Sequence, residues 1–279
     1  MFGAFWVASP VFGTWENVRS ILELTAPILI LATGLTIVLT TGEFDLSFPG
    51  IVGLAAVGAV QMMAWAGQDA TVAVAAGVAT GVAAGVVAGV LVSFQRTSSF
   101  IVTLALSGVW SGVALGVSNG GATISDVTDG YVSLTLKAPL GIPLSVIYAV
   151  AIAVLGFVVA RWTVFGRHAE AIGSNATAAR LAGIRLVRTR VAAFAAAGLC
   201  AGIAGVVLSS QTAQFAPGLA GGLFIPPFVA AFFGISVLAA GKFNVFGTVV
   251  GALFVSTLQT GLIIQGAQAW SATWLSAAC

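Results

Sequence analysis

Residues 163–190 read TVFGRHAEAIGSNATAARLAGIRLVRTR and form almost the only long polar segment in a largely apolar chain. Together with Arg161, this segment holds six of the ten basic residues and the only histidine, His168. Basic residues of membrane proteins concentrate in cytoplasmic loops. The segment therefore predicts which face of a membrane domain lies inside the cell, and it is a candidate docking surface for a soluble partner.

The composition around this segment places the chain in a membrane. Hydrophobic residues make up 59% of the 279 residues and charged residues 6%, whereas about a quarter of a soluble domain is charged. Apolar runs repeatedly reach the roughly 20 residues that a helix needs to cross a bilayer. They lack the alternating polarity of barrel strands. We therefore expect an all-α, polytopic transmembrane helical bundle that forms one membrane domain over residues 1–279.

Eight apolar segments are expected to span the bilayer. They lie at residues 21–41, 48–66, 70–94, 100–118, 142–160, 191–209, 222–240 and 246–267. In the third segment, Gly77, Gly81, Gly85 and Gly89 share one helix face, which predicts close contact with a neighbouring helix. Cys200 lies in an apolar run and is expected to pack there, because the two cysteines have no disulfide or metal spacing.

The distribution of charge orients these spans. If all eight cross, one face holds Arg96, the six arginines of residues 161–190 and Lys242, and the other holds only Arg19 and Lys137. The face with more basic residues is cytoplasmic by the positive-inside rule. Both chain ends then lie outside, and their apolar residues are too few to span. We therefore expect a longer design with one further helix at each end.

A short capped helix is predicted inside the basic segment. Asn175 is expected to begin it by accepting backbone N–H bonds, and the alanines that follow favour helix. Arg180 suits the negative end of the helix dipole, and Gly183 suits a left-handed stop. This helix favours docking of a partner, whereas the alternative is a basic anchor at the lipid headgroups. Both interpretations remain open at this point.

An acidic pair, Glu43 and Asp45, interrupts the basic inner face. It is either a gate or coupling contact that pairs with an arginine, or a cap on the next helix, where a carboxylate is favourable. The capping alternative is preferred. Residues 42–45 (GEFD) also resemble residues 241–244 (GKFN), and both precede Gly-rich apolar segments. This likeness favours an internal duplication of the kind that transporters carry.

The centres of the predicted spans contain no Asp, Glu, Lys, Arg or His. Proton-driven transporters usually need such groups, so we expect the energy to come from a separate subunit and the solute to be neutral and polar. The chain has no GxxxxGK[ST] phosphate loop and is expected neither to bind ATP nor to be an enzyme. Candidate groups along the solute path, each equally able to bond a neighbouring helix, are Thr33, Thr36, Gln61, Ser107, Ser111, Gln259 and Thr260.

Two other classes of function compete with an energy-coupled transporter. A passive channel or facilitator for a small neutral solute is the main alternative, since it too needs no buried charge. An intramembrane protease needs a nucleophile and a base at membrane depth, and the only histidine lies in the cytoplasmic segment. The longest external segment, residues 118–145, has the Gly, Asp and Thr content of turns, and we expect it to contact a partner.

Four patches carry a resemblance to a known family. They are residues 21–50, which end in TGEFDLSFPG, residues 163–184 (TVFGRHAEAIGSNATAARLAGI), residues 197–211 (AGLCAGIAGVVLSSQ) and residues 238–267 (LAAGKFNVFGTVVGALFVSTLQTGLIIQGA). In sequence and order they are similar to the permease subunit of the ribose/xylose/arabinose/galactose class of bacterial ABC importers. The second patch is the most specific. The chain departs from the family at Phe48-Pro49-Gly50 and at residues 218–228 (GLAGGLFIPPF).

The resemblance implies a ten-helix permease of the bacterial plasma membrane that pairs with a second permease protomer. It implies no cofactor in this chain and no nucleic-acid partner, with ATP and Mg²⁺ bound by a cytoplasmic ABC ATPase subunit. That ATPase is expected to dock on residues 161–190, while an extracytoplasmic sugar-binding protein delivers the solute. The coupling residues implied by the resemblance are Gly166, Arg167, Ala171, Gly173, Asn175, Ala178, Ala179, Arg180 and Gly183.

Overall fold

The computed structural model describes residues 2–94, 97–124, 127–237 and 241–267. Arg96, which entered the charge count, and the closing residues 268–279 lie outside the described residues. Within them the chain is built from helices, and its one β-pairing is an isolated bridge between Thr123 and Phe215. The prediction of an all-α bundle is confirmed.

Each of the eight predicted spans contains a helix. Six helices are long and apolar enough to cross a membrane: α2 (Trp15–Thr40), α4 (Ala70–Phe94), α5 (Ser99–Val117), α7 (Leu144–Trp162), α10 (Leu186–Thr212) and α12 (Val245–Ile264). The other two are shorter, α3 (Phe48–Ala64) and α11 (Ile225–Val237). Short helices complete the described fold: α1 (Phe2–Ala8), η1 (Pro10–Gly13), α6 (Asp129–Leu136), η2 (Pro139–Gly141), α8 (Val164–Ser174), α9 (Ala176–Leu181) and η3 (Gly221–Leu223).

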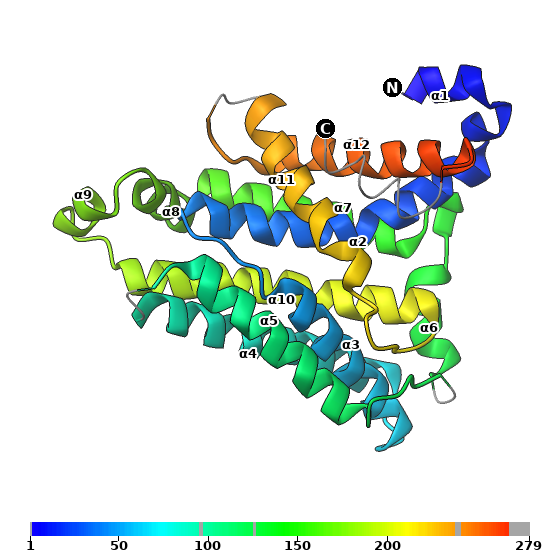
Figure 1. Ribbon diagram of the computed structural model, residues 1–279, viewed down its shortest axis with the longest axis horizontal. Helices are drawn as coiled ribbons and strands as arrows, with labels where there is room; N and C mark the ends of the chain where they lie inside the picture. The colour runs from blue at the N-terminus through cyan, green and yellow to red at the C-terminus, as the bar shows by residue number, and fades with distance from the viewer. Residues whose placement is uncertain (1, 95–96, 125–126, 238–240, 268–279) are drawn as a thin grey trace.

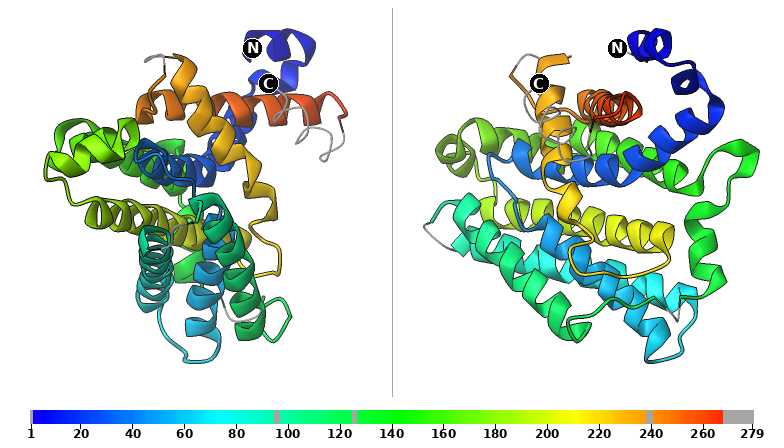
Figure 2. Two further views of the ribbon diagram at one scale, coloured as in Figure 1. Left: turned by 60° about the vertical axis from the view of Figure 1, so that its left-hand side comes forward. Right: turned by 45° about the vertical axis from the view of Figure 1, so that its right-hand side comes forward.

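The long helices form two layers. In the first layer α2 packs against α7, α11 and α12, and in the second α3 packs against α4, α5 and α10. Figure 1 shows α2, α7 and α12 on one side of the molecule and α4, α5 and α10 on the other. The layers meet where α2 lies along α10, a contact that we call the α2–α10 seam and that is also visible in Figure 2.

Small residues allow the helices to approach closely. Gly81 and Gly85 of α4 lie against Gly198 and Gly202 of α10, and a Cβ added to Gly81 would meet the Gly202 Cα at 2.5 Å. This contact confirms the prediction drawn from the four-residue spacing of glycines in α4. Across the seam, a Cβ on Gly34 of α2 would lie 2.9 Å from the Cys200 Cβ. Cys200 is buried, as predicted.

The segment 118–145, which is predicted to be external, contains a helix that was not predicted from the sequence. Helix α6 packs against both α7 and α10, so it bridges the two layers. Hydroxyl groups hold it there, since Tyr131 Oη lies 2.7 Å from Ser209 Oγ and Thr135 Oγ1 lies 2.7 Å from Ser210 Oγ. Ser210 Oγ also donates to the Tyr131 carbonyl at 2.7 Å. These bonds fix α6 over one end of α10.

Candidate functional site

The basic segment folds into two consecutive helices, α8 and α9, which we call the coupling hairpin (residues 163–185). Thr163 begins α8, its side chain accepting from the Gly166 N–H at 3.2 Å. Asn175 begins α9, and its Oδ1 accepts from the Ala178 N–H at 3.0 Å. Gly183 follows α9 with φ of +81°, the left-handed conformation that glycine adopts without strain. The predicted capped helix is confirmed, and α8 is an addition to it.

The coupling hairpin shares a small core with the start of α10. Ile172, Ala179 and Leu186 are buried together, with Ala171, Ala176 and Ile184 packed around them. Two glycines bring the hairpin against the bundle. A Cβ on Gly166 would overlap the Ala160 carbonyl of α7, and one on Gly173 would overlap the Thr40 carbonyl at the end of α2. The hairpin is thus a folded unit seated on helices of the first layer.

The predicted coupling residues fall into two groups by exposure. Gly166 and Ala179 are buried and Ala171 is partly buried. Ala179 and Ala171 belong to the small core, whereas Gly166 lies against α7. The exposed members are Arg167, Gly173, Asn175, Ala178, Arg180 and Gly183. Sequence reasoning missed Leu181, which ends α9 and is 85% exposed. A large apolar residue on the polar side of a capped helix is the signal that could have found it.

An ion pair links the start of α10 to the turn after α2. Arg190 Nη2 lies 2.8 Å from Glu43 Oε1, and the two side chains are 24% and 14% exposed. One alternative for Glu43 was a contact with an arginine, and the geometry provides that contact. Because α10 directly follows the coupling hairpin, a displacement of the hairpin would reach Glu43 through Arg190. The role of Glu43 as a gate or coupling contact stays a prediction.

A second ion pair lies at the same end of the molecule. Lys242, in the turn before α12, pairs with Glu170 of α8. The turns at residues 42–45 and 241–244 also share local features, because Gly42 and Gly241 both have positive φ and each turn leads into a helix. Both turns place a phenylalanine ring against Phe232 of α11. Two similar turns therefore contact the basic segment, while the duplication itself stays a prediction.

Asp45 bonds Ser47 just before α3 and forms no ion pair among the described residues. The residue is fully buried, and its Oδ1 accepts from the Ser47 N–H at 2.8 Å and from Ser47 Oγ at 2.6 Å. Ser47 is the residue that precedes α3, so the carboxylate lies at the positive end of that helix. This arrangement fits the preferred alternative. Asp45 Oδ2 has no hydrogen-bond partner among the described residues. Burial raises the pKa of the Asp45 carboxyl above its ordinary value of 3.8.

The raised pKa of Asp45 predicts how stability depends on pH. Between pH 3.8 and the raised pKa, the folded chain keeps a proton that the unfolded chain releases. The free energy of unfolding therefore falls as the pH rises through this window. Asp45→Asn removes the titration and is expected to flatten the profile and to preserve or raise stability at neutral pH. Thermal unfolding in detergent between about pH 4 and pH 8 measures this effect. A variant with the wild-type pH profile would contradict it.

The predicted solute-path residues lie on four helices, α2, α3, α5 and α12. Thr33 and Thr36 donate to carbonyls of α2 at 2.8 and 2.7 Å, and Thr36 Oγ1 also lies 2.8 Å from Thr248 Oγ1. Gln61 Nε2 donates to Thr123 Oγ1 at 3.1 Å. The remaining residues lie on α5 and α12: Ser107, Ser111, Gln259 and Thr260. For Thr33, Thr36 and Gln61 the contacts favour the alternative of bonding within the bundle. Their role in solute passage stays a prediction.

Known proteins match this chain over nearly its whole length. The family described as "Branched-chain amino acid transport system / permease component" matches residues 17–278. Ribose import permease protein RbsC of Escherichia coli K12 is 31% identical over 265 residues, which cover 94% of this chain and 82% of that protein. RbsC of Bacillus subtilis is 33% identical over 261 residues, with coverages of 93% and 81%.

A relative with a different named sugar is also similar. Xylose transport system permease protein XylH of Escherichia coli K12 is 27% identical over an alignment of 344 positions, gaps included. The alignment covers 98% of this chain and 88% of that protein. No solved structure matches the chain.

Proposed function

The chain belongs to the family of branched-chain amino acid transport system permease components, and from this premise we propose that it carries a monosaccharide in an ATP-driven importer. It is a multi-pass permease subunit of the plasma membrane. The relatives are named for ribose and for xylose, both neutral pentoses. A neutral solute suits a bundle whose span centres hold no charged residue.

Coupling to ATP hydrolysis is assigned to the exposed side of the coupling hairpin. The observation that carries this assignment is a folded hairpin, held by a core shared with the start of α10, that presents Leu181, 85% exposed, at its tip. A loop that only anchored the chain to lipid headgroups would need no such core. An exposed apolar side chain beside Ala178 and Arg180 is suited to a groove on a cytoplasmic ATPase subunit, because partner helices bury apolar residues in such grooves.

Movement of the hairpin would reach both layers of the bundle. Helix α8 packs against α2 and α7 of the first layer and against α10 of the second. The Arg190–Glu43 pair joins the start of α10 to the turn between α2 and α3, and the Lys242–Glu170 pair joins α8 to the turn before α12. In this proposal, ATP and Mg²⁺ bind the partner ATPase, and closure of its subunits moves the hairpin.

The remaining partners are proposed from the family. A sugar-binding protein would deliver the solute at the outer surface, where α6 bridges α7 and α10. A second permease protomer would complete the membrane part of the importer, so that each coupling hairpin meets one ATPase subunit.

Reconstitution tests the proposed function. The chain is placed in liposomes with the ATPase and binding protein from neighbouring genes, and uptake of D-ribose and D-xylose is measured with and without ATP. We expect uptake that requires ATP and the binding protein. Equilibration of sugar through the chain alone, without ATP, would show a passive facilitator instead. A matched control replaces ATP with a non-hydrolysable analogue.

A further inference from the structure

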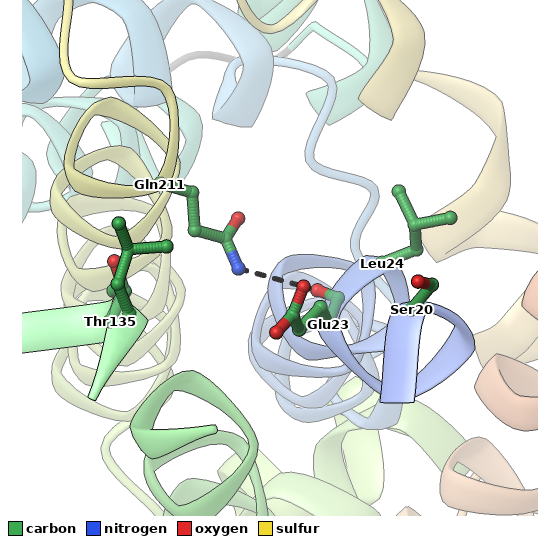
Figure 3. A pocket seen from close by; sticks show the side chains of 6 residues that line it. Ser20, Glu23, Leu24, Thr135 and Gln211 are labelled. Atoms are coloured by element: carbon green, nitrogen blue, oxygen red, sulfur yellow. Dashed lines mark hydrogen bonds between the residues drawn. The ribbon is translucent and has the colours of Figure 1, made fainter. Parts of the chain in front are cut away.

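A cavity lined by both apolar and polar side chains lies at the end of the α2–α10 seam that is remote from the coupling hairpin. Its volume is about 330 Å³, and its lining residues are Ser20, Glu23, Leu24, Thr135, Leu136 and Gln211. Figure 3 shows Gln211 of α10 reaching across the seam towards Glu23 of α2, with Thr135 of α6 beside it. This volume falls within the range of about 300–1,000 Å³ that is typical of small-molecule sites.

The cavity lies at the outer end of the bundle. Helix α2 ends at Thr40, next to the coupling hairpin, and Glu23 lies near its opposite end. Helix α10 starts beside the hairpin, with Arg190 in its first turns, and Gln211 lies in its last turn. Because the arginine-rich end is cytoplasmic, the cavity faces the side from which an importer receives its solute.

A proline supplies the cavity with a main-chain acceptor. Pro27 lies inside α2 and has no N–H to donate to the carbonyl of Glu23, four residues earlier. Gln211 Nε2 donates to this carbonyl from α10 at 3.4 Å. That distance is long for an N–H···O bond, so a solute hydroxyl could take its place with little loss. Carbonyls released in this way are tolerated within a membrane where they line a cavity.

The cavity carries little net charge despite its carboxylate. Arg19 Nε donates to Glu23 Oε1 at 3.1 Å, which pairs the acid with a base one turn away. The other polar lining groups, Ser20, Thr135 and Gln211, are neutral. Leu24 and Leu136 add apolar surface, and both are more than half exposed. A neutral ligand with several hydroxyls and an apolar C–H face matches this mixture of groups.

We propose that this cavity is an outward-facing subsite for a monosaccharide, in which Gln211 and the main-chain carbonyl of Glu23 bond sugar hydroxyls. The proposal rests on the proposed function and adds a position for its solute. The subsite joins the two layers, because Gln211 belongs to α10 and Glu23 to α2. Sugar binding would therefore depend on the distance between α2 and α10 at their outer ends.

The test measures sugar binding to the purified chain in nanodiscs by saturation-transfer NMR, with D-ribose and D-xylose as ligands. Gln211→Leu removes the amide at nearly constant volume and is expected to weaken binding roughly tenfold or more. Gln68→Leu makes the same chemical change at an exposed outer residue and is expected to leave binding unchanged. Equal affinity in Gln211→Leu and in the wild-type chain would overturn the proposal, as would the absence of any sugar signal with the wild-type chain.

A second variant distinguishes loss of the sugar contact from loss of folding. Pro27→Ala restores an N–H that bonds the Glu23 carbonyl within α2, so it withdraws the acceptor while strengthening the helix. We expect weaker sugar binding with an unchanged or higher unfolding temperature. Uptake by the complete importer separates the two proposals. Normal ATP-driven uptake by importers with Gln211→Leu and with Pro27→Ala would contradict the subsite alone. Absence of uptake by the wild-type importer would contradict the proposed function.

Discussion

Leu181→Asp is expected to abolish co-purification of the partner ATPase and to stop ATP-driven sugar uptake. Leu181 is 85% exposed at the end of α9 and takes no part in the core formed by Ile172, Ala179 and Leu186. A charge there should leave the fold intact, because exposed substitutions usually change stability by less than about 0.5 kcal/mol. A buried apolar anchor of an interface contributes about 2 kcal/mol or more, which is roughly 30-fold in affinity.

The control for this experiment is Leu181→Met, which keeps an apolar side chain and should keep the ATPase bound. Ala178 offers a second exposed position where a charge should weaken docking. Ala179 is unsuitable because it is 4% exposed, and a larger side chain there would disrupt the hairpin core. Retention of the ATPase by both Leu181→Asp and Ala178→Asp would place the docking surface elsewhere.

The features that could be predicted from the sequence are those fixed by local chemistry. Hydrophobic runs predicted the long helices. The Asn175 cap and Gly183 predicted where α9 begins and ends. Each prediction depends only on residues that are close together in the sequence. The four-residue spacing of glycines in α4 correctly indicated a close helix contact. It could not name the partner, since Gly198 and Gly202 of α10 lie far along the chain. Local patterns thus predicted the elements but not their neighbours.

The features that escaped prediction depend on contacts between distant residues. Gln211 meets the Glu23 carbonyl across 188 positions of sequence. Helix α6 is held by hydroxyls of Ser209 and Ser210, more than 70 positions away. No feature of the sequence around Glu43 indicates that this residue, rather than another acidic residue, forms the ion pair with Arg190. Seven predicted path residues were chosen because their side chains can bond a hydroxyl, a criterion that buried helix contacts satisfy equally well.

Reversing one charge of the Arg190–Glu43 pair is expected to uncouple the permease, and reversing both is expected to restore it. The side chains are 24% and 14% exposed, so Arg190→Glu leaves two acids facing each other in a largely desolvated site. Breaking a buried pair costs about 3–5 kcal/mol, and partial exposure should reduce this to about 2–3 kcal/mol. Glu43→Arg should have a similar effect. The double variant Glu43→Arg, Arg190→Glu regains an opposite-charge pair and should recover most of the stability.

A double-mutant cycle isolates the pair from other effects of each substitution. The four proteins are compared by thermal unfolding in detergent and by ATP-driven uptake in liposomes, so that stability and coupling are read separately. Lys242→Ala breaks the Lys242–Glu170 pair, whose side chains are 68% and 48% exposed, and provides the matched control for the stability measurement. Its stability should hardly change, because exposed ion pairs contribute little. If importers assembled with the single-reversal variants hydrolyse ATP and transport sugar at wild-type rates, the contact between α10 and the turn after α2 does not transmit movement of the hairpin.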